Sequence, residues 1–111
     1  FHHQEHVRLA WLYLRTEPYP QALDRMIATI RRVAGHAGVP EKFHYTMTVA
    51  WMRLVDSAMV AHPSASDFDS LITANPSLLS VKALDEFYSP GRIHSAEAKS
   101  QMVDPDLKPL P

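Results

Sequence analysis

Histidines are the residues of this chain whose types and spacing could do chemistry. The 111 residues contain seven histidines and no cysteine, so this segment has no thiolate metal site, disulfide or cysteine nucleophile. His2, His3 and His6 open the sequence, and His44 follows Glu41 by three residues. Imidazole binds Zn, Fe, Cu or Ni and also exchanges protons near neutral pH. These histidines therefore predict either a metal site or a site for acid–base chemistry or ligand binding.

Helical spacing decides which of these histidines can act together. Residues three or four apart share a helix face, and His3 and His6 extend the apolar stripe that continues at Val7 and Ala10. We therefore expect His3 and His6 to act as a pair, and His2 is a reserve candidate for the same site. His44 starts a second stripe that steps by three and four along residues 44–61, and Glu41 would share its face if the helix began at Pro40. The members of this stripe are His44, Met47, Trp51, Leu54, Ala58 and Ala61.

The two histidine-bearing helices are expected to run parallel. A helix over about residues 21–34 returns the chain between them, so their starts should meet at one end of a bundle. We therefore predict that His3, His6 and His44 hold one divalent first-row metal ion there. His36, in the turn before the later helix, is a further reserve at that end. Three imidazoles leave a position open for water or substrate, which is typical of catalytic zinc sites.

Three other side chains near His44 are candidates for a catalytic role. Glu41 could add a carboxylate ligand, which would favour iron or manganese. Tyr45 and Thr48 could position a bound water molecule or orient an imidazole. Only one Glu-x-x-His pair occurs in the chain, so a dinuclear site is not expected.

The start of the chain resembles a group of small bacterial all-helical proteins that have no assigned activity. The resemblance is carried by His2-His-x-x-His-x-Arg-Leu-Ala-Trp-Leu-Tyr-Leu14 and by Phe43-His-Tyr-Thr-Met-Thr48. The group has a Tyr-His-Glu-Thr-(Leu/Ile)-Thr segment at the second motif. The resemblance implies an all-helical fold and matching positions at His2, His3, His6, His44 and Thr48. It implies no reaction, and the group's Glu is replaced here by Tyr45.

The rest of the chain predicts an all-α fold with three main helices and two or three short C-terminal helices. Apolar residues recur at three and four, and no segment alternates like a strand. The short helices are expected after Ser66, over residues 78–88, and over 96–103 behind a cap at Ser95. We predict one helical domain over residues 1–103 and an extended proline-rich tail over 104–111.

Composition excludes several classes of partner. The net charge is −1 and the pI is about 6.7, so no general attraction to nucleic acid or to acidic membranes is expected. No apolar run approaches the roughly 18 residues that span a bilayer. No signal peptide is recognisable, so the cytoplasm is the expected compartment, although a removed leader stays an open alternative.

Three function classes fit these observations, and whether the protein is an enzyme stays open. The first is a mononuclear metal site that polarises water or a small substrate. The second is a metal-free enzyme or small-ligand binder that uses the histidines as acid, base or hydrogen-bonding groups. The third is a helical interaction module, such as a homodimer, in which the histidines are structural.

Overall fold

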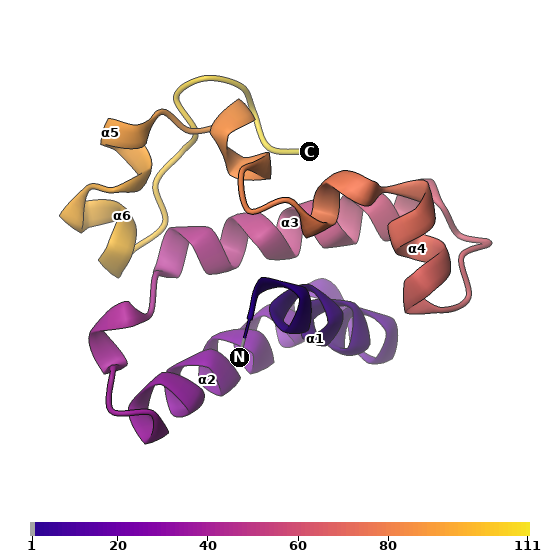
Figure 1. Ribbon diagram of the computed structural model, residues 1–111, viewed down its shortest axis with the longest axis horizontal. Helices are drawn as coiled ribbons and strands as arrows, with labels where there is room; N and C mark the ends of the chain where they lie inside the picture. The colour runs from indigo at the N-terminus through magenta and orange to yellow at the C-terminus, as the bar shows by residue number, and fades with distance from the viewer. Residues whose placement is uncertain (1) are drawn as a thin grey trace.

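The computed structural model describes residues 2–111 as a succession of helical segments (Figure 1). The three long helices are α1 (His3–Thr16), α2 (Tyr19–His36) and α3 (Tyr45–Ala61). The short α-helices are α4 (Phe68–Ala74), α5 (Pro90–Ile93) and α6 (Ala96–Ser100), and the 3-10 turns are η1 (Pro40–Lys42), η2 (Pro76–Leu79) and η3 (Ala83–Glu86). No strand occurs within this range, so the all-α prediction is confirmed. None of the helices described is both long and apolar enough to cross a membrane.

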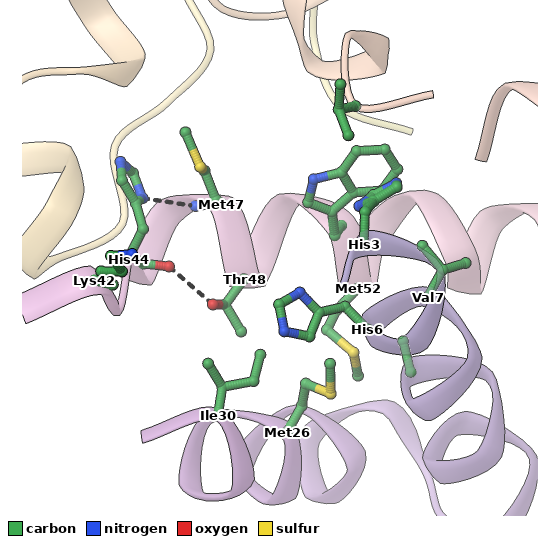
Figure 2. A pocket seen from close by; sticks show the side chains of 13 residues that line it. His3, His6, Val7, Met26, Ile30, Lys42, His44, Met47, Thr48 and Met52 are labelled. Carbon is green, nitrogen blue, oxygen red and sulfur yellow. Dashed lines mark hydrogen bonds between the residues drawn. The ribbon is translucent and has the colours of Figure 1, made fainter. Parts of the chain in front are cut away.

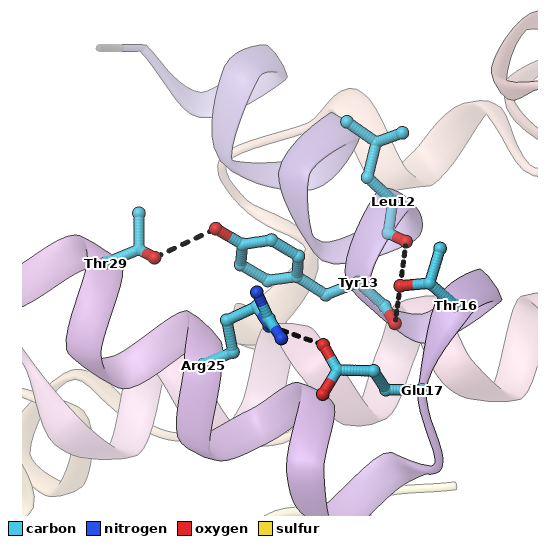
Figure 3. A network of polar contacts seen from close by, with 6 residues as sticks. All are labelled: Leu12, Tyr13, Thr16, Glu17, Arg25 and Thr29. Carbon is cyan, nitrogen blue, oxygen red and sulfur yellow. Dashed lines mark hydrogen bonds and ion pairs between the residues drawn. The ribbon is translucent and has the colours of Figure 1, made fainter.

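The turn between α1 and α2 is fixed by prolines and by polar contacts across the helix pair. Pro18 caps α2 and Pro20 lies in its first turn, where a missing N–H costs no hydrogen bond. The Tyr13 hydroxyl lies 2.9 Å from the Thr29 hydroxyl, and Arg25 forms an ion pair with Glu17 (Figure 3). These contacts join the end of α1 to the second turn and the middle of α2.

α3 is buried on nearly every side because other parts of the chain cover it on opposite flanks. In Figure 1, α1 and α2 lie below α3, while α5, α6 and the C-terminal segment lie above it. Its buried side chains accordingly face all directions: Thr46, Thr48, Val49, Ala50, Met52, Val55 and Ala58. Two clusters of buried apolar side chains result, and the half-buried Trp51 and Leu54 pack against both. The charged side chains of α3 are confined to one stretch in its second half, at Arg53 and Asp56 with Ser57 beside them, and such a short polar face is typical of a helix in this central position.

The C-terminal segment is tied to the body of the protein by buried hydrogen bonds. The Thr46 hydroxyl donates to the Gln101 carbonyl at 2.7 Å and accepts from the Val103 N–H at 3.2 Å. The buried Tyr88 hydroxyl donates to the Val103 carbonyl at 2.8 Å. Beyond Gln101 the described chain contains no helix, as its prolines predict, yet Leu110 still packs against the second cluster. The segment therefore belongs to the folded structure.

Several predicted boundaries are wrong, each for a local reason. The expected helix from Pro40 is interrupted: η1 ends at Lys42, Phe43 and His44 are extended, and α3 begins at Tyr45. The predicted helix over residues 78–88 is instead the two turns η2 and η3, separated by extended Ser80. Asp67 rather than Ser66 caps α4, since its carboxylate accepts from the Ser70 N–H at 2.8 Å. The Ser95 cap is confirmed.

Candidate functional site

The N-terminal parts of α1 and α3, together with the middle of α2, line a cavity of about 280 Å³. We call it the histidine cavity, because His3, His6 and His44 all line it (Figure 2). Thr48 and Lys42 are its other polar lining residues. Its remaining lining is apolar and consists of Val7, Ala10, Met26, Ile30, Met47, Trp51, Met52 and Val81. The three histidines predicted to lie at one end of the bundle thus all line one cavity.

His3 anchors the start of α1 to two other parts of the chain. Its Nε2 lies 3.0 Å from the carbonyl oxygen of Leu78, so this nitrogen carries the hydrogen and donates. Its ring also meets the Trp51 ring at an interplanar angle of 60°, with the two centroids 4.3 Å apart. An edge-on pair of this kind adds packing energy to the buried area. One face of the histidine cavity is thus held rigid by His3.

His6 is the histidine that projects into the cavity. Its ring lies between Thr48 of α3 and the side chains of Met26 and Ile30 of α2 (Figure 2). Burial is the main cause that lowers the pKa of His6, and the nearby His3 lowers it further, while Glu5 partly opposes both. Its ordinary pKa is 6.5, so the ring is neutral at pH 7. A neutral imidazole suits an apolar cavity, since it brings no buried charge.

His44 is the N-cap of α3 and uses both ring nitrogens in hydrogen bonds. Nδ1 accepts from the Met47 N–H at 3.0 Å, and Nε2 donates to the Ile93 carbonyl at 2.8 Å. Burial lowers the pKa of His44, and the contact with Ile93 offsets part of that effect. The ring thus joins the first turn of α3 to α5. The prediction that His44 lies inside the helix, on one face with Glu41, is wrong because the chain is extended at His44.

The other candidate residues lie outside the cavity lining. His2 and His36 are exposed, the first beside the start of α1 and the second at the end of α2. Glu41 is exposed on η1. The Tyr45 ring packs edge-on against Phe43, with centroids 6.4 Å apart.

Thr48 is the one predicted catalytic candidate that lines the cavity. Its hydroxyl donates to the His44 carbonyl at 2.8 Å, which leaves the oxygen lone pairs to accept a further hydrogen bond. Among residues 2–111, no three His, Asp or Glu side chains are placed to hold one metal ion. In addition, both ring nitrogens of His44 are used in hydrogen bonds, whereas a metal ligand must offer a ring nitrogen.

Three features of the cavity were missed in the sequence. Met26, Met47 and Met52 look like gap-filling core residues, yet all three line the cavity. Lys42 lines it although it is exposed, and Val81, which is 69% exposed, also contributes. Only the position of Lys42 immediately before the Phe43-His44 motif offered a signal.

Comparisons with protein families, with curated proteins and with solved structures found no match to this chain. The resemblance to the bacterial all-helical group stays a prediction.

Proposed function

We propose that this protein binds a small, mainly apolar molecule in the histidine cavity without the help of a metal. The observation that carries the proposal is the lining itself: His6 and Thr48 project polar atoms from two helices into a cavity whose lining residues are mostly apolar. Ligand sites in proteins usually combine an apolar wall with a few placed polar groups. This is the second of the three function classes predicted from the sequence.

The size and the charge state of the cavity support this class of ligand. A volume of about 280 Å³ has room for a molecule of roughly ten heavy atoms, if each occupies about the volume of a water molecule. The lowered pKa of His6 keeps its ring neutral at pH 7. Binding a neutral ligand beside it therefore buries no charge.

The hydrogen bonds of His44 favour metal-free binding over the mononuclear metal site. A metal ion held by His3, His6 and His44 would have to displace either the Met47 N–H or the Ile93 carbonyl from the His44 ring. The first change would remove the cap of α3, and the second would leave the Ile93 carbonyl without this partner. His3 would have to bind through Nδ1, because its Nε2 donates to Leu78.

A neutral probe tests the proposal directly. 1-Hexanol is titrated into the protein while the indole N–H signal of Trp51, which lines the cavity, is followed by NMR. We expect a saturable shift in the wild type and its loss in Ala10→Leu, since the added side chain fills the cavity. Ala28→Leu, at an exposed position of α2, is the matched control and should bind like the wild type. An unchanged titration in Ala10→Leu, or no saturable shift in the wild type, would overturn the proposal.

A further inference from the structure

A second cavity of about 300 Å³ adjoins the histidine cavity. It lies between the C-terminal half of α2 and the segment around η1, and Val33, Ala34 and Phe43 form part of its wall. His6 and Ile30 belong to the linings of both cavities, and so does Lys42. The two cavities therefore meet at these shared side chains.

The charged side chain in the walls of the two cavities is a cation. Neither cavity has an Asp or Glu among its lining residues in the described part of the chain, whereas Lys42 lines both. The Arg31 guanidinium carbon lies 4.7 Å from the centre of the Phe43 ring, so a second cation lies beside the wall of the second cavity. Glu41 precedes Lys42 but is exposed and lines neither cavity. An anionic group at this place would find two cations close by and no carboxylate in the wall.

We propose that the two cavities form one elongated site for a monocarboxylate with an apolar chain. The carboxylate lies in the second cavity near Lys42 and Arg31, and the chain passes His6 and Ile30 into the histidine cavity. Three methionines, Met26, Met47 and Met52, suit a flexible chain there because the thioether side chain adapts to irregular shapes. This inference rests on the proposed function and names the class of ligand.

Chain length and charge together test the inference. Hexanoate, decanoate and 1-hexanol are compared by calorimetric titration at low salt. We expect decanoate to bind at least about tenfold more tightly than hexanoate, since each buried methylene contributes about fourfold. Added salt should weaken decanoate binding and leave 1-hexanol binding unchanged, because only the carboxylate interacts with the two cations.

Two variants locate the carboxylate end of the site. Ala34→Phe fills the second cavity, so we expect it to lower decanoate affinity at least about tenfold, the loss of a few buried methylenes, while 1-hexanol still binds. Lys42→Gln should weaken decanoate binding by about two- to fivefold, as for an exposed ion pair. Arg32→Gln removes an exposed cation of α2 that lines neither cavity, and it should behave like the wild type.

The possible failures are distinguishable. If 1-hexanol binds but Ala34→Phe leaves decanoate affinity unchanged, the second cavity is not part of the site and the present inference is overturned. The same conclusion follows if decanoate binds no more tightly than hexanoate. If 1-hexanol does not bind at all, the proposed function itself fails. Continued binding of 1-hexanol by Ala34→Phe also shows that this variant is folded.

Discussion

Nε2 of His44 donates a hydrogen bond of 2.8 Å to the carbonyl oxygen of Ile93, which lies 49 residues further along the chain. Nδ1 of the same ring accepts from the N–H of Met47. These two contacts require the neutral ring with its hydrogen on Nε2. One side chain thus caps the central helix and holds a short C-terminal helix against it. His44 is a structural member of the cavity wall.

Replacing His44 should therefore destabilise the protein. In His44→Ala we expect the free energy of unfolding to fall by about 2 kcal/mol, roughly half from the lost cap and half from the lost bond to Ile93. His44→Asn should lose only about 1 kcal/mol, since Asn is a good N-cap but is too short to replace imidazole at Ile93. Urea denaturation measures both values.

The neighbouring His94 provides the control for this prediction. It is exposed, so His94→Ala should change the unfolding free energy by less than about 0.5 kcal/mol. Equal stability of wild type and His44→Ala would contradict the structural role of His44.

The convergence of the histidines could be predicted from sequence, whereas their individual roles could not. Two local signals support the prediction that the starts of two helices lie at one end of the bundle. They are the apolar stripe that follows His3 and His6, and the proline break at residues 18–20. The role of His44 depends on the extended backbone at Phe43 and His44. This extended segment makes contacts with residues distant in the sequence: Arg31 lies over the Phe43 ring, and the Ile93 carbonyl accepts from the His44 ring.

The same limit explains why periodicity described α3 incompletely. The predicted stripe included Trp51 and Leu54, which are half-buried, and Ala61, which is exposed. Met52 and Val55 are fully buried although they lie off the stripe. The periodicity argument assumes that a helix has one buried face and one solvent-exposed face. α3 has little solvent-exposed surface, because the C-terminal segment covers the side away from α1 and α2. Nothing local to residues 45–61 predicts that cover.

Stability should fall as the pH drops from about 7.5 to 5.5. Burial is the main cause that lowers the pKa values of both His6 and His44 below their ordinary 6.5. The unfolded chain therefore takes up protons on these rings before the folded protein does. Their contribution to stability is present above pH 6.5 and is lost as the pH falls through the folded pKa values.

Thermal unfolding across this range tests the sign. His44→Asn removes one of the two titrating groups while keeping a cap, so its melting temperature should depend less on pH than that of the wild type. The lowered pKa values of Glu5, Asp67 and Asp106 act in a more acidic range. A melting temperature that rises as the pH falls to 5.5 would contradict the prediction.

Added zinc should not raise the melting temperature of the protein. Zinc binding by His3, His6 and His44 would require a hydrogen bond of the His44 ring to break, and the free-energy cost of breaking it opposes binding. Differential scanning calorimetry with and without a small excess of Zn²⁺ measures the effect, with EDTA-treated protein as the reference. A stoichiometric zinc isotherm that disappears in both His6→Ala and His44→Asn would instead support the metal site.

Thr46→Val should be among the more damaging conservative substitutions in this chain. The Thr46 side chain is fully buried, and its hydroxyl donates a hydrogen bond to the Gln101 carbonyl while it accepts one from the Val103 N–H. Valine has nearly the same shape but leaves both backbone groups without this partner, which costs about 2 kcal/mol. Thr73→Val is the matched control, because Thr73 is exposed and its hydroxyl bonds only within α4, to Asp69. Urea denaturation should show a clear loss for Thr46→Val and almost none for Thr73→Val, and equal stability of the two would mean that the C-terminal segment is held mainly by its apolar contacts.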